Sequence, residues 1–152
     1  MLYQTSRQVI LASIMTKKKL YVGCALSKAT KEFRDKVFHL RDDLLSEYFE
    51  VLKFAWDRKT DKSMFSEVNV YEADLACVDG ADIFVAICDE PSIGLGVEIE
   101  RAIQKKKKIF AFHHKDLTIG KIVDAALQST QLGRLYIYDN VEDIVEIVKK
   151  EA

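Results

Sequence analysis

The hydrophobic positions of this chain alternate between short unbroken apolar runs and longer stretches with an apolar residue every three or four positions. Unbroken runs are typical of buried strands, and the wider spacing is typical of amphipathic helices. The runs predict strands at residues 20–26, 49–56, 83–88, 108–112 and 134–138. The wider spacing predicts helices at 29–48, 67–78, 94–105, 118–128 and 141–151, and the polar stretch 57–66 is the longest predicted loop.

Short apolar strands that alternate with helices predict a parallel sheet with both faces covered. Five such strands fit a single α/β domain with a doubly wound, flavodoxin-like or Rossmann-like sheet. In these folds ligands bind at the carboxyl ends of the strands, so residues 23–27, 88–96 and 112–118 are the candidate site segments. We expect residues 1–16 to be an N-terminal appendage and residues 17–152 to form the domain.

Composition excludes several classes of function. A chain of 152 residues with a net charge of −1 lacks the basic excess of a protein that binds nucleic acid polymers. No apolar stretch approaches the roughly 18 residues of a membrane span. Cys24, Cys77 and Cys88 lie in or beside apolar segments, which indicates reduced thiols and a cytoplasmic protein. Adjacent His113 and His114 would point to opposite faces of a strand, so we predict no metal site.

The most informative segment is CDEPSIGLGVEIERA, residues 88–102. It lacks the third glycine of the dinucleotide fingerprint and the Gly-Lys-Ser/Thr of a P-loop. Ser92, Gly94 and Gly96 remain at the start of a helix, where free N–H groups favour an anion. Asp89, before this turn, is expected to be a solvated loop residue. Glu98 is expected in the first helical turn, where the helix dipole would keep it ionised as a nucleophile. The alternative for Glu98 is the glutamate of a capping box.

This segment, with GADIFVAI before it and VYEADLACVDGAD further upstream, resembles the nucleoside 2-deoxyribosyltransferase superfamily. It is most similar to the branch of 2′-deoxynucleoside 5′-phosphate N-hydrolases, whose turn has the pattern P-S-x-G-x-G-x-E. LYVGCAL is similar to the family's first strand and its glycine. The resemblance covers most of residues 20–151. It implies a homodimeric enzyme, without a cofactor, that hydrolyses the N-glycosidic bond of (deoxy)nucleoside 5′-monophosphates.

The resemblance also implies roles for particular residues. Glu98 matches the nucleophile that attacks the anomeric carbon of the sugar, and Asp74 matches a second carboxylate that orients the sugar and assists proton transfer. Ser92 matches the serine that binds the 5′-phosphate, at a position where transferases of free nucleosides have aspartate. The N–H groups near Gly94 and Gly96 are expected to share in binding the phosphate.

The loop after the first strand departs from the family pattern. The N-hydrolases have G-S-I-R-G-G here, with an arginine for the phosphate, whereas this chain has Leu26 at the arginine position. Two alternatives follow: either the substrate differs, or the phosphate site is built from Ser27, Lys28 and Ser92. Gly23 is a further candidate for substrate binding.

The family's tyrosine on the first strand is also displaced. Its position is occupied by Leu20, and Tyr21 is one residue further along, which on a strand would turn its ring to the other face. Two alternative functions follow from these comparisons. One is a nucleoside 2-deoxyribosyltransferase that exchanges bases, against which Ser92 argues. The other is a non-catalytic nucleotide-sensing module of the same fold, which the altered loop favours.

Overall fold

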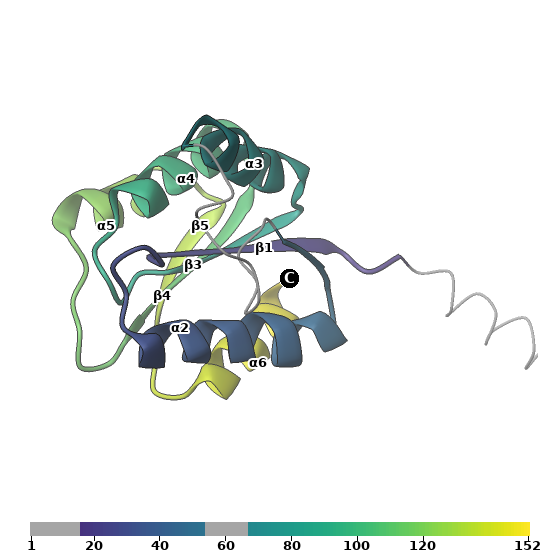
Figure 1. The fold of residues 1–152 in the computed structure, drawn as a ribbon, viewed down its shortest axis with the longest axis vertical. Coiled ribbons are helices and arrows are strands. Elements are labelled where there is room, and N and C mark those ends of the chain that lie inside the picture. The colour runs from purple at the N-terminus through teal and green to yellow at the C-terminus, as the bar shows by residue number, and fades with distance from the viewer. Residues whose placement is uncertain (1–15, 54–66) are drawn as a thin grey trace, which may run out of the picture.

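Five parallel strands in the order β2-β1-β3-β4-β5 form the sheet of this protein (Figure 1), as the pattern of the sequence predicts. The structure is a computed structural model that describes residues 16–53 and 67–152. The strands are β1 (Lys19–Cys24), β2 (Glu50–Leu52), β3 (Ile83–Ile87), β4 (Lys108–His114) and β5 (Gly133–Tyr138). The α-helices are α2 (Lys31–Phe38), α3 (Glu67–Gly80), α4 (Ile93–Gln104), α5 (Lys121–Gln128) and α6 (Val141–Glu151).

The helices form one layer on each face of the sheet. Helices α3, α4 and α5 cover one face, and α2 and α6 cover the other (Figure 1). The central strand β3 is buried along its whole length. Its alternate side chains enter different cores: Val85 packs with the layer of α2 and α6, and Phe84 packs with that of α3 and α4. Within the described ranges, no helix has the length and hydrophobicity that a membrane span requires.

Strand β1 is the point where the strand order reverses. It pairs with β2 on one side and with β3 on the other, and Cys24 at its end lies opposite Ile87 of β3. A doubly wound sheet binds ligands in the crevice at this kind of position, outside the carboxyl ends of the strands. The loops that follow β1 and β3 therefore open on one shared crevice.

The helix predicted at 29–48 is a composite. After α2 the chain forms a π-helical turn, η1 (His39–Leu44), and then a 3₁₀ turn, η2 (Leu45–Glu47). Strand β2 is shorter than the predicted 49–56, of which residues 54–56 lie outside the described part. The predicted loop 57–66 and nearly all of the predicted appendage also lie outside it.

The prediction that Asp89 is a solvated loop residue is wrong. Its side chain is 3% exposed and lies over the ends of the strands. It accepts hydrogen bonds from the backbone N–H of His114 (2.8 Å), from Lys36 Nζ (2.8 Å) and from the Tyr138 hydroxyl. One carboxylate therefore ties α2 to the ends of β3, β4 and β5.

Replacing this carboxylate should destabilise the fold. We expect Asp89→Ala to lower the free energy of unfolding by about 2–3 kcal/mol, because Tyr138 and Lys36 lose a buried partner. Urea unfolding measures the change. Glu146→Ala, which removes an exposed partner of Lys149 on α6, is the control and should leave the free energy of unfolding nearly unchanged. Equal effects of the two substitutions would contradict a buried network at Asp89.

Candidate active site

A cavity of about 190 Å³ opens at the carboxyl end of β1, in the crevice where the strand order reverses. Four parts of the chain line it: β1 with its following loop, the π-helical turn η1, α3, and the start of α4. The lining residues are Tyr21, Val22, Cys24, Leu26, Ser27, Arg41, Val70, Asp74, Ser92, Gly94, Leu95 and Glu98. The structure thus brings together five residues predicted from the sequence, namely Ser27, Asp74, Ser92, Gly94 and Glu98.

The hydroxyl of Tyr21 joins two carboxyl groups in this cavity. It lies 2.9 Å from Glu98 Oε1 and 3.4 Å from Asp74 Oδ1. The ring is held by stacking on Phe84, with centroids 5.8 Å apart. The expectation that Tyr21 faces away from the site is therefore wrong. Leu20 instead packs in the core beneath α2 and α6, so the site's tyrosine is two residues before Gly23.

Glu98 is buried, with 8% of its surface exposed. Its pKa is raised from 4.5 to about 8, mainly by burial and also by the charge of Asp74, while the hydrogen bond from Tyr21 opposes the shift. The prediction that a helix terminus keeps Glu98 ionised is wrong, because α4 begins at Ile93 and Glu98 lies in its second turn. The capping-box alternative is also wrong, since the third residue of α4 is Leu95, whose N–H donates to Ser92 Oγ.

Asp74 is half-buried on α3, one helical turn after Val70. Burial raises its pKa, and the hydrogen bond from Tyr21 lowers it. Burial, followed by the two carboxylates, keeps the pKa of Tyr21 well above its ordinary value, so the phenol remains a donor. Two interacting carboxyls titrate as a pair. At neutral pH this pair holds a proton, and it can supply one carboxylate and one carboxylic acid to a reaction.

Gly23 makes room for Glu98. A methyl group added at this position would lie 2.6 Å from Glu98 Oε2 and 2.7 Å from the ring of Phe84. Side-chain contacts this short do not occur in folded proteins, so any larger residue would displace the carboxyl group. The glycine predicted for substrate binding lies beneath the proposed nucleophile.

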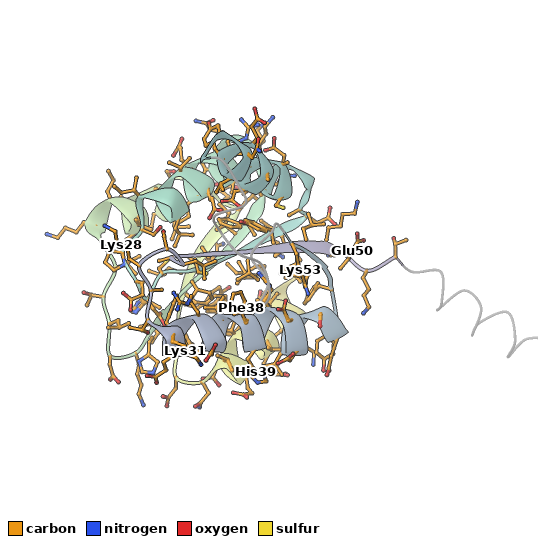
Figure 2. The ribbon with its side chains drawn as sticks, in the orientation of Figure 1. Lys28, Lys31, Phe38, His39, Glu50 and Lys53 are labelled. Atoms are coloured by element: carbon orange, nitrogen blue, oxygen red, sulfur yellow. The ribbon has the colours of Figure 1, made fainter. Side chains whose placement is uncertain are left out.

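Two predicted phosphate-binding residues do not line the cavity. Lys28 is exposed in the loop after β1, at the edge of the molecule (Figure 2). Gly96 lines a neighbouring cavity with Pro91 and Thr118. Its N–H donates to the carbonyl of Ser92 within α4, so this N–H is not available to a ligand.

Arg41 and Cys24 line the cavity although the sequence analysis did not select them. Arg41 follows Val37 by four residues and precedes Leu45 by four, and both of these are buried. A charged residue on an apolar helical stripe was the signal that could have revealed it. The pKa of the Cys24 thiol is raised to about 12, mainly by burial and also by Glu98, while Arg41 opposes the shift. The carboxyl group and the guanidinium therefore both influence the charge state of the Cys24 thiol.

The described residues contain no group of three His, Cys, Asp or Glu side chains placed to hold a metal ion. His113 Nδ1 lies 2.9 Å from the carbonyl oxygen of His114. The His114 ring instead faces Asp116 and Asp139 at the ends of β4 and β5. Neither histidine lines the cavity at β1.

This chain is similar in sequence to two curated proteins and similar in fold to solved structures. No family model matches the chain. The chain is 30% identical over 77 residues to the 5-hydroxymethyl-dUMP N-hydrolase of Branchiostoma floridae, an alignment of 51% of this chain and 71% of the relative. It is 32% identical over 78 residues to the enzyme of the same name from Mus musculus, which covers 51% of this chain but 44% of the relative. The chain therefore matches less than half of the mouse protein's length.

Two solved structures share the fold over nearly the whole chain. The CMP N-glycosidase of Clostridium botulinum has a TM-score of 0.62 at 18% identity, covering 89% of this chain and 100% of that one. A conserved protein of Enterococcus faecalis has a TM-score of 0.57 at 20% identity, covering 90% and 100%. At these identities the likeness concerns the fold.

The raised pKa of Glu98 should make stability depend on pH. The folded state binds this proton more tightly than the unfolded state does, so stability falls as pH rises from 4.5 to about 8. Glu98→Gln removes the titration, and its stability relative to wild type should grow across this window by at most about 1.4 kcal/mol per pH unit. Urea unfolding of both proteins at several pH values measures this. Parallel profiles would mean that Glu98 titrates normally.

The contact between Gly23 and Glu98 gives a second prediction. Gly23→Ala should destabilise the protein by about 1–3 kcal/mol, because the new methyl group overpacks the space under the carboxyl group. Gly96→Ala is a matched control, since nothing lies within 4 Å of its added methyl group. In a helix interior it should be neutral or stabilise by up to about 1 kcal/mol. Thermal unfolding compares the two, and a harmless Gly23→Ala would refute the close packing.

Proposed function

This chain belongs to the nucleoside 2-deoxyribosyltransferase superfamily, and from that premise we propose that it hydrolyses the N-glycosidic bond of (deoxy)nucleoside 5′-monophosphates. The observation that carries the proposal is the carboxyl pair of Glu98 and Asp74 on the hydroxyl of Tyr21. The two curated relatives support the reaction class, because both are named as N-hydrolases of a deoxynucleoside monophosphate.

The separation of the carboxyls favours a covalent route. The Tyr21 hydroxyl contacts one oxygen of each carboxyl, at 2.9 Å and 3.4 Å, so these two oxygens lie no further apart than about 6.3 Å, which is below the roughly 6.5–9.5 Å that separates the carboxyls of inverting glycosidases. An inverting site must hold a water molecule between its carboxyls. A close pair instead fits the retaining arrangement, in which one carboxylate is the nucleophile.

In the first step the proton of the pair passes from Glu98 to Asp74, and Glu98, now a carboxylate, forms an ester bond to the anomeric carbon while the N-glycosidic bond breaks. The bonding electron pair leaves with the base, and Asp74 as carboxylic acid donates the proton that the base requires. Tyr21 donates its hydrogen bond to Glu98 Oε1. This donor holds the attacking carboxylate in place as positive charge develops on the sugar.

In the second step Asp74, now ionised, removes a proton from water, and the water oxygen attacks the anomeric carbon. The ester bond breaks, Glu98 leaves as carboxylate, and the products are free base and sugar phosphate. Base exchange uses the same intermediate with a base in place of water. Transfer is therefore the alternative that the pair also permits, and Ser92, in place of an aspartate, argues against it.

The 5′-phosphate would bind at the start of α4. Ser92 caps this helix with its hydroxyl, and Gly94 lies in the first turn beside the cavity. N–H groups at a helix start favour an anion. Ser27 lines the same cavity and is part of this proposed phosphate site. A cytoplasmic homodimer, implied by the resemblance, is part of the same proposal.

The experiment compares single substitutions on a panel of nucleoside monophosphates and nucleosides. We expect wild type to release base from a deoxynucleoside monophosphate, Glu98→Gln to lower kcat by about 10³-fold or more, and Asp74→Asn by about 10²-fold. Glu100→Gln is the matched control, since Glu100 lies two residues further on the exposed side of α4. Released base is quantified by chromatography, with and without an added acceptor base.

The outcomes separate the alternatives. Free base without an acceptor supports hydrolysis, and exchanged nucleotide with an acceptor supports transfer. Binding without turnover would support a sensing module and overturn the proposal. A Glu98→Gln variant as active as wild type would overturn the role of the nucleophile.

A further inference from the structure

A single guanidinium lies deep in the wall of the same cavity. Arg41, on the π-helical turn η1, is 6% exposed. Among the described residues that line the cavity, it is the one with a permanent positive charge. The carboxyl groups of Glu98 and Asp74 belong to the same cavity. The site therefore combines an acidic part with a cationic part.

Arg41 is held rigidly by its neighbours. Its Nε and Nη2 donate to the two oxygens of Asp42, at 2.7 Å and 3.0 Å, and its guanidinium carbon lies 5.0 Å from the centroid of the Phe38 ring. Lys53 Nζ lies 2.9 Å from the same carboxylate. Phe38 is the last residue of α2, and Lys53 directly follows β2 (Figure 2). Two cations thus share one carboxylate, and the group as a whole is positive.

The pairing with Asp42 leaves the outer edge of the guanidinium free of these bonds. A guanidinium has five N–H donors, and the contacts to Asp42 use one on Nε and one on Nη2. Both N–H groups of Nη1 and the second of Nη2 remain. These form the end-on fork that binds two oxygens of a phosphate. Asp42 therefore fixes the plane of Arg41 while its phosphate-binding edge stays available.

Stability alone does not explain an arginine at this position. The residues four before and four after it, Val37 and Leu45, are buried hydrophobics. A well-packed apolar side chain at such a place is often as stabilising as a buried ion pair or more so. π-Helical turns are also frequent at functional sites. An arginine retained on the apolar stripe, at a π-turn and facing a cavity, indicates a ligand.

We propose that Arg41, across the same cavity from the helix start at Ser92 and Gly94, completes the site for the 5′-phosphate through its free edge and so selects nucleotides over nucleosides. This assignment rests on the proposed function. Leu26 occupies the position of the family's arginine and carries no charge. Arg41 supplies the missing cation from a different element of the fold. Cys24 lines the same cavity as Glu98 and Arg41. A nucleotide fits this polarity, with its phosphate at Arg41 and its anomeric carbon at the carboxyls.

The test uses a ligand without a base or a glycosidic bond, so that it does not depend on turnover. Binding of 2-deoxyribose 5-phosphate and of 2-deoxyribose is measured by calorimetry for wild type, Arg41→Gln, Arg41→Lys and Arg134→Gln. Arg134→Gln is the matched control, because Arg134 is exposed on β5 at the far edge of the sheet. We expect Arg41→Gln to weaken binding of the phosphate probe by about 10- to 100-fold. The affinity of Arg41→Lys for this probe should lie between those of wild type and Arg41→Gln, because lysine keeps the charge but lacks the forked pair of donors.

Several results would overturn the assignment. These are wild type failing to prefer the phosphate probe, Arg41→Gln keeping the wild-type preference, or both probes weakening equally. Should Arg41→Gln fail to fold, an unchanged preference in Arg41→Lys would exclude the bidentate contact. The two proposals fail separately. Wild type that binds the phosphate probe through Arg41 but cleaves no nucleotide refutes the reaction and keeps the assignment, and cleavage with Arg41-independent binding does the reverse.

Discussion

The hydroxyl of Tyr21 holds two carboxyl groups at a place where both are partly or wholly removed from water. The phenol hydroxyl has one hydrogen. It donates this hydrogen to Glu98 Oε1, 2.9 Å away, while Asp74 Oδ1 lies 3.4 Å from the same oxygen. Two ionised carboxylates this close would repel each other strongly in a medium of low polarity. Burial and this repulsion together raise the pKa of Glu98 to about 8, so the pair keeps a proton of its own at neutral pH. The rest of the site depends on this arrangement.

The sheet makes the arrangement possible through the alternation of β1. Leu20 and Val22 pack toward α2 and α6, whereas Tyr21 faces α3 and α4. Gly23 follows Tyr21 on the same face, and its missing side chain is the space that Glu98 occupies. At the end of the strand the two helix layers meet. There the acidic groups from α3 and α4 and Arg41 from the opposite layer can line one cavity.

The sequence predicted the order of elements because each buried strand is an unbroken apolar run and each helix has a regular apolar stripe. It predicted Glu98 and Asp74 as candidates because their turn and helix match a known pattern. It failed where one residue changes the geometry. Helix α4 begins at Ile93, so Glu98 moves to the second turn and the N–H of Gly96 is used inside the helix. Whether Ser92 or a residue nearer Gly94 caps the helix depends on packing that the local sequence does not specify.

Tyr21 and Arg41 were missed for different physical reasons. Position counting placed the site's tyrosine at Leu20, but the face of a strand is set by its pairing with β3, which the sequence does not contain. Arg41 lies within a periodic helical stretch, and the π-turn that places it in the cavity wall has no local signature. Both residues can be recognised once burial is known, because a buried phenol and a buried guanidinium each require polar partners.

The charges of the cavity also constrain the chemistry. At neutral pH the acidic pair carries one proton, and the group of Arg41, Asp42 and Lys53 is positive. A phosphate bound at Arg41 adds negative charge, which makes it harder for the carboxyl pair to lose its proton to solvent. In the proposed reaction the proton would stay in the site until the departing base accepts it from Asp74, while positive charge develops on the sugar beside Glu98. Burial, which keeps a proton on the carboxyl pair, would thus retain the proton that breaking the N-glycosidic bond requires.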